Sequence, residues 1–139
     1  MAKKALLAIA VVLAISLSYI YFGNTANKTE IKENGIAYQK ISAEEAMAII
    51  EGTRDFILLD VRTEAEYSEN RINGAVSLPL AEIEDKATTI IADRETIILV
   101  YCYGGVRSKE ACQKLIRLGY TTVYDMGGIS AWPYPDMIE

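Results

Sequence analysis

The alternation of short apolar runs with capped, helix-like segments is the feature that most constrains this chain. The apolar runs that predict strands lie at residues 36–41, 56–60, 75–78, 96–101 and 122–125. Two of the segments between them open with a capping box, Ser42 with Glu45 and Thr63 with Glu66, which predicts helix starts there. Strands separated by helices pair in parallel, so we expect an open three-layer α/β sheet with helices on both faces.

A cysteine loop follows the fourth apolar run. Cys102 comes directly after that run, and an amphipathic stretch that predicts a helix begins at Lys109 and stops at Gly119. A turn between a buried strand and a helix points unpaired backbone N–H groups inward, which favours a thiolate and makes Cys102 a candidate nucleophile. The remaining loop residues that we expect to surround its sulfur are Tyr103, Gly104, Gly105, Val106, Arg107 and Ser108.

Composition removes several alternative chemistries. The chain has no histidine, which excludes Cys-His and Ser-His-Asp catalysis and His-ligated metal sites. Its two cysteines are too few for a Cys-only zinc site. From residue 27 onward there are 12 Lys and Arg against 19 Asp and Glu, which leaves a formal charge of −7 and argues against nucleic acid as a partner.

Several short motifs occur in an order and spacing that resembles the rhodanese (sulfurtransferase) family over residues 36 to 135. These motifs are Asp60-Val61-Arg62, Glu66-Tyr67, Gly74 to Pro79, the Cys-x-x-Gly-x-Arg-Ser loop from Cys102, and Met126-Gly127-Gly128 with Trp132. The resemblance implies a five-stranded parallel sheet with the reactive cysteine at a strand end. It also implies an enzyme without cofactor or metal, in which Cys102 takes sulfane sulfur from thiosulfate or a persulfide and passes it to cyanide or a thiol.

The resemblance and the residue chemistry suggest roles for the other site residues. Arg107 is the bidentate candidate for the oxyanion end of a sulfonyl donor, or else it pairs with Asp60 or a glutamate to hold the loop. Asp60 and Arg62 are expected to support the loop more than to touch substrate. Tyr103 is expected at the mouth of the pocket, where it shapes specificity. Cys112, on a buried helix face, is expected to be an inert core residue, with a resolving role as the alternative.

Two other functions compete with sulfur transfer. A cysteine-loop phosphatase uses a similar anion cradle, but such enzymes place five residues between cysteine and arginine, and this loop has four. A membrane-tethered module that relays sulfur to a protein acceptor without turnover is also compatible with the loop, since the loop does not identify the acceptor.

The first 22 residues differ from the rest of the chain. Lys3 and Lys4 precede an apolar run from Ala5 to Phe22, which predicts a hydrophobic helix with its N-terminus inside the cytoplasm. The segment 1–22 is either an anchor or a signal peptide, and the lack of an Ala-x-Ala site favours the anchor. Residues 23–35 then form a polar tether and 36–139 the domain. We expect that domain outside the cytoplasm, held at the membrane, or secreted if the segment is cleaved.

Overall fold

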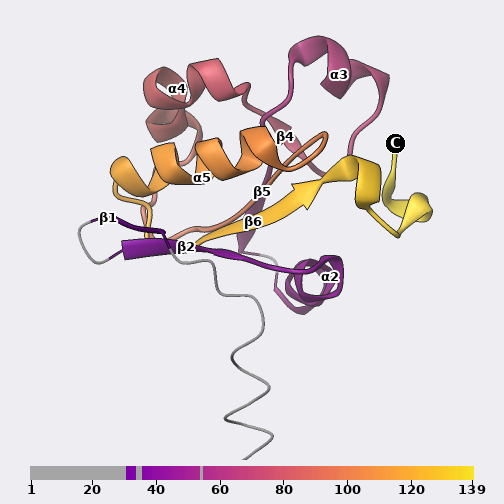
Figure 1. Ribbon diagram of the computed structural model, residues 1–139, viewed down its shortest axis with the longest axis horizontal. Helices are drawn as coiled ribbons and strands as arrows, with labels where there is room; N and C mark the ends of the chain where they lie inside the picture. Colours follow the sequence, from indigo (N-terminus) through magenta and orange to yellow (C-terminus); the bar gives the residue numbers. More distant parts are fainter. Residues whose placement is uncertain (1–30, 34–35, 54) are drawn as a thin grey trace, which may run out of the picture.

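The computed structural model describes residues 31–33, 36–53 and 55–139, which build one twisted sheet flanked by helices (Figure 1). The strand order is β1-β2-β6-β5-β3-β4. The strands are β1 (Ile31–Glu33), β2 (Ile36–Lys40), β3 (Phe56–Asp60), β4 (Val76–Ser77), β5 (Ile97–Cys102) and β6 (Val123–Gly128). All neighbours from β2 to β4 pair in parallel, which confirms the predicted five-stranded parallel sheet.

The sixth strand, β1, pairs antiparallel with β2 at the edge of the sheet. It lies inside the segment 23–35 that the sequence analysis treats as a polar tether. A three-residue edge strand has no room for the long apolar run that marks the buried strands, so its sequence carries little signal. The sheet therefore begins earlier in the chain than residue 36.

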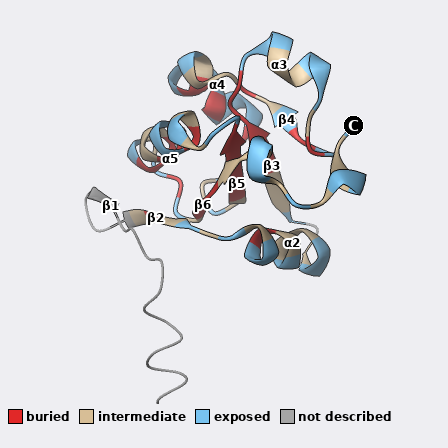
Figure 2. Ribbon diagram, turned by 45° about the vertical axis from the view of Figure 1, so that its right-hand side comes forward, coloured by how far each residue is buried: buried red, intermediate tan, exposed pale blue. Residues whose placement is uncertain are grey.

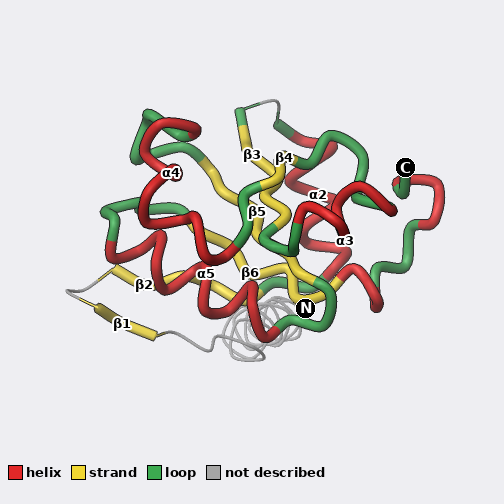
Figure 3. Tube along the Cα trace, turned by 90° about the horizontal axis from the view of Figure 1, so that it is seen from above, coloured by secondary structure: helices red, strands yellow, loops and turns green. Residues whose placement is uncertain are grey.

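The helices cover both faces of the sheet, as expected. They are α2 (Ala43–Gly52), α3 (Glu64–Glu69), α4 (Ile83–Ile90) and α5 (Val106–Arg117), with 3₁₀ turns η1 (Leu80–Glu82), η2 (Ile129–Ala131) and η3 (Pro135–Met137). Helices α4 and α5 pack on one face, while α2 lies on the other (Figures 1 and 3). Both capping boxes are present, at Ser42 and Thr63. The helix expected over 80–91 is divided into η1 and α4.

Strand β5 runs through the middle of the core, where Figure 2 colours it as buried. Its side chains alternate between two apolar clusters on the two faces of the sheet. Val100 and Cys102 join the apolar cluster under α4 and α5. Leu99 and Tyr101 join the cluster that includes α2 and the C-terminal segment. All four are at most 1% exposed, which explains why this strand is a continuous apolar run in the sequence.

The carboxyl ends of the central strands meet at one edge of the sheet. Asp60 lies opposite Tyr101 in the β3–β5 pair, and Cys102 lies opposite Gly128 in the β5–β6 pair. Open parallel sheets bind their ligands beyond this edge. Three separate parts of the sequence therefore converge there.

The predicted hydrophobic helix, 5–22, lies outside the described residues, as does most of the tether. In the part of the chain that the structure describes, no helix has the length and apolar character needed to cross a membrane.

Candidate active site

Cys102 is the last residue of β5, and its sulfur lies beneath a tight turn. The backbone N–H of Gly105 donates to the Cys102 Sγ at 3.0 Å. The residue is 1% exposed. An N–H aimed at the sulfur stabilises negative charge there, whether on a thiolate or on a sulfur bound to it.

Gly105 ends the turn and begins α5. Its φ of +93° lies in the left-handed region, which favours glycine, and it occupies the N-cap position with no side-chain cap. The helix therefore begins at Val106, three residues before the start expected at Lys109. This early start places Val106, Arg107 and Ser108 in the first helical turn, whose N–H groups lack intrahelical acceptors. The cradle expected from the loop is thus a short turn plus the start of a helix.

Not all of the loop glycines serve the same purpose. Gly104 has no positive φ, and a Cβ built on it would meet no atom within 4 Å. Ser108 is buried, and its hydroxyl donates to the Gly105 carbonyl at 3.1 Å, which holds the turn against the helix. Of these two loop glycines, only Gly105 therefore adopts the left-handed backbone conformation.

The segment after β6 supports the loop from behind. The Tyr103 carbonyl accepts hydrogen bonds from the Ser130 backbone N–H at 3.2 Å and from its hydroxyl at 2.8 Å. A Cβ on Gly128 would overlap that same carbonyl. Gly128 belongs to one of the predicted family motifs without an assigned role, and no sequence pattern indicates a role for Ser130. The Gly127-Gly128 pair was the available signal for a close backbone approach.

Arg107 forms a bidentate ion pair with Glu66 across the site. Its two terminal nitrogens donate to the two carboxylate oxygens at 2.7 and 2.8 Å. Glu66 also accepts from the Thr63 N–H and hydroxyl, as the capping box of α3 requires. Arg107 and the cap lower the pKa of Glu66 to about 2, and Glu66 raises the pKa of Arg107. Pairing with a nearby glutamate to hold the loop is one of the two roles expected of Arg107; the sequence marks Glu66 as a helix cap and a motif residue, but not as that glutamate.

Asp60 and Arg62 form a second ion pair, deep in the protein. The Arg62 Nε donates to both Asp60 oxygens at 3.0 Å, and the guanidinium also donates to the side chain and carbonyl of Asn70. Asp60 is fully buried and Arg62 is 3% exposed. The pair ties the end of β3 to the end of α3, and α3 carries Glu66. The hydrogen bonds of the described residues therefore link this pair to the loop through α3, Glu66 and Arg107.

Two apolar side chains of the loop face solvent. Tyr103 is 58% exposed and Val106 is 81% exposed, whereas Cys102 is 1% exposed. The second cysteine, Cys112, lies on the buried face of α5, where burial raises the pKa of its thiol. A protonated, buried thiol is a poor nucleophile, which agrees with the core role expected for Cys112.

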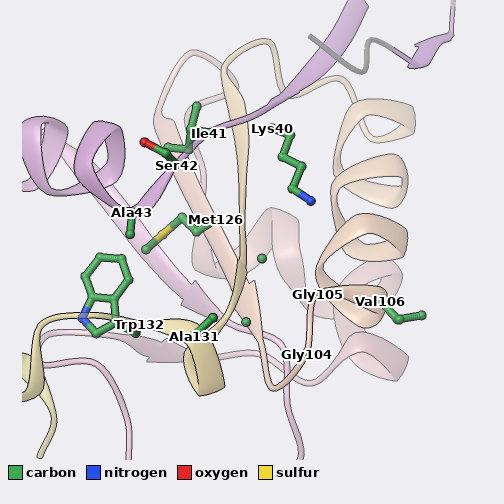
Figure 4. A pocket seen from close by; sticks show the side chains of 12 residues that line it. Lys40, Ile41, Ser42, Ala43, Gly104, Gly105, Val106, Met126, Ala131 and Trp132 are labelled. Carbon is green, nitrogen blue, oxygen red and sulfur yellow. The ribbon is translucent and has the colours of Figure 1, made fainter. Parts of the chain in front are cut away.

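A groove of about 440 Å³ lies beside the loop (Figure 4). One wall is Gly104, Gly105 and Val106 of the cysteine loop and α5. The other walls come from the end of β2, the start of α2, and the segment from β6 to η2. Such a volume is typical of sites for small organic ligands.

The fold and the loop agree with the family comparison. The family model for the rhodanese-like domain matches residues 42–133. The chain therefore belongs to the rhodanese-like domain family, whose resemblance was expected over residues 36 to 135.

Similar proteins point to the same class. Thiosulfate sulfurtransferase GlpE of Coxiella burnetii is 35% identical over 68% of this chain and 87% of that protein. Thiosulfate sulfurtransferase PspE of Escherichia coli is 34% identical over 51% of this chain and 68% of that protein. Among solved structures, an Escherichia coli rhodanese with anions superimposes with a TM-score of 0.52 at 33% identity, covering 55% of this chain and 93% of that one. These relatives support a rhodanese-type sulfurtransferase.

Proposed function

We propose that this protein transfers sulfane sulfur through a persulfide on Cys102, with thiosulfate or a persulfide as donor and a thiol or cyanide as acceptor. The observation that carries the proposal is the Gly105 N–H aimed at the Cys102 Sγ at the end of a parallel strand. The names of the sulfurtransferase relatives support the same chemistry.

The donor step needs only a thiolate and positive surroundings. The Cys102 thiolate attacks the outer sulfur of thiosulfate, the sulfur–sulfur bond of the donor breaks, and sulfite leaves with the electron pair. Cys102 then carries a persulfide, and the turn of Tyr103 to Gly105 offers N–H groups to its charge. Arg107 keeps N–H groups beyond the two that donate to Glu66, and these are available to the sulfonate oxygens.

The acceptor step returns the enzyme to its starting state. A thiolate or cyanide attacks the outer sulfur of the persulfide, and the electron pair of the broken bond goes to Cys102. No cofactor takes part in either step.

Intact-mass measurement after incubation with thiosulfate and removal of excess reagent tests the carrier. We expect one added sulfur per chain, which cyanide removes. Cys102→Ser should gain none, while Cys112→Ser, the matched control, should gain one and lose about 1 kcal/mol of stability. Unmodified wild-type protein, or equal loss of loading in both folded variants, would overturn the single-cysteine carrier.

We also propose that Ala5 to Phe22 tethers the domain on the outer face of the membrane, which Lys3 and Lys4 support through the positive-inside rule. Fractionation with protease treatment of spheroplasts tests this. We expect the domain in the membrane fraction and sensitive to protease. Protection from protease contradicts the orientation, and recovery in the soluble fraction contradicts the anchor.

A further inference from the structure

The groove beside the cysteine loop combines an apolar lining with a positive end. Its apolar side chains come from two segments that are far apart in the sequence, the one from β2 to α2 and the one from β6 to η2 (Figure 4). They are Ile41, Ala43, Met126, Ala131 and Trp132. A small inorganic anion such as thiosulfate gains nothing from such walls, whereas a carbon chain does.

Lys40 supplies the positive end. Its ammonium group points toward Gly105 in Figure 4, and the side chain lines both the groove and an adjoining cavity of about 110 Å³. Lys109 lines the smaller cavity too. Asp125 also borders it, but that carboxylate is 4% exposed and accepts from the Gly127 N–H at 2.9 Å. The two ammonium groups therefore outnumber the one carboxylate.

These lysines differ from the other cations near the site. Arg62 and Arg107 are each neutralised by a carboxylate, and Lys86 and Lys114 form ion pairs on the helices. Neither Lys40 nor Lys109 has an ion-pair partner among the described residues. In a domain with an acidic balance, two ammonium groups that have no ion-pair partner in the described part of the chain lie beside the reactive loop and complement a negatively charged ligand.

We propose that this groove binds the sulfur acceptor, and that the acceptor is a small organic thiol whose apolar chain carries a carboxylate that lies at Lys40. This inference rests on the proposed function. The acceptor's thiolate attacks the outer sulfur of the Cys102 persulfide, so a new sulfur–sulfur bond forms on the acceptor. The old bond breaks, Cys102 keeps its electron pair as a thiolate, and the acceptor leaves as a hydropersulfide.

The test separates loading from discharge. Protein is loaded with thiosulfate, freed of excess reagent and checked by intact mass, then mixed with 6-mercaptohexanoate or with the neutral thiol 6-mercaptohexanol. The second-order rate of persulfide loss is measured for each. We expect wild-type protein to prefer the carboxylate, and we expect 0.5 M salt to weaken that preference.

Three variants locate the effect. Lys40→Gln should lower the rate with 6-mercaptohexanoate about fivefold and leave the neutral thiol nearly unchanged. Ala43→Glu should lower it similarly, because the new carboxylate repels the acceptor from the groove wall. Lys86→Gln removes the same charge on the remote helix α4 and should change neither rate.

The outcomes distinguish the two proposals. Failure of wild-type protein to load sulfur overturns the proposed function itself. Normal loading with an unchanged ratio of the two rates in Lys40→Gln and Ala43→Glu overturns the acceptor site alone. An equal fall with both thiols in Lys40→Gln also overturns it, because Lys40 would then act on the persulfide and not on the acceptor's carboxylate.

Discussion

Arg62 and Arg107 belong to neighbouring parts of the same sheet edge, and both pair with a carboxylate, but their surroundings differ. Arg62 is 3% exposed, and its guanidinium donates to Asp60 and Asn70. Arg107 is 35% exposed and donates two bonds, both to Glu66. The Arg62 guanidinium therefore donates to groups inside the protein, while Arg107 retains N–H groups that a ligand can reach.

At the carboxyl edge of the sheet, a buried ion pair that stabilises the fold lies next to an exposed ion pair that borders the reactive loop. The buried pair fixes the end of β3 and the start of the following segment, so that α3 presents Glu66 at a defined place. Glu66 then holds Arg107 beside the cysteine loop. The buried Asp60–Arg62 ion pair thus helps to hold the more exposed Glu66–Arg107 pair in place. Donors that are oriented before an anion arrives bind it without the cost of reorganisation.

The largest expected effect is on the buried pair. Asp60→Ala leaves the Arg62 charge buried without its carboxylate, so we expect a loss of about 3–5 kcal/mol in the free energy of unfolding. Urea titration measures it. Glu139→Gln, which breaks the exposed Arg71 pair, is the control and should cost less than about 1 kcal/mol. Similar losses in both variants would mean that burial does not distinguish the pairs.

The second-largest effect is expected where the segment after β6 contacts the cysteine loop. Gly128→Ala forces a Cβ against the Tyr103 carbonyl, and we expect it to cost about 1–3 kcal/mol and to slow persulfide formation. Gly104→Ala is the matched control, because its Cβ enters open space. Thermal unfolding of the two variants decides the point, and equal stability would show that the loop moves away from β6 without penalty.

The exposed arginine is expected to act on the donor. Arg107→Lys keeps the charge but loses the fork, so thiosulfate use should fall more than tenfold, about 1.4 kcal/mol, while use of a neutral polysulfide falls less. The ratio of kcat/KM for the two donors is the measurement. If both values fall alike and the melting temperature drops with them, Arg107 only braces the loop.

The smallest effect concerns pH. The native pKa of Glu66, about 2, lies below its ordinary value of 4.5, so the unfolded chain binds more protons between these values. The contribution of Glu66 to stability is therefore present above about pH 4.5 and is lost as pH falls toward 2. Urea titrations at pH 6 and pH 3 should show a smaller acid loss in Glu66→Gln than in wild-type protein. An identical pH dependence in both proteins would contradict the assigned role of the ion pair.

Much of the fold follows from local sequence. Apolar runs such as 96–101 mark strands because side chains buried on both faces must all be apolar, and Ser42 and Thr63 mark helix starts because their caps are local. Cys102 could be singled out for the same reason, since a strand, a glycine turn and a helix are consecutive in the chain. The position of β1 and the start of α5 at Val106 were less accessible, because each depends on pairing or on one left-handed residue.

The sequence by itself determined the parallel α/β class, the strand end that carries Cys102 and the family to which the chain belongs. Only the tertiary structure decided that Arg107 meets Glu66, that Ser130 and Gly128 support the loop, and that Lys40 reaches the groove. Glu66 and Arg107 are 41 residues apart and Ser130 is 27 residues from Tyr103, and no local pattern records which distant side chains will meet. The strand order decides which of these residues meet, because it brings the ends of β2, β3, β5 and β6 to the same edge of the sheet.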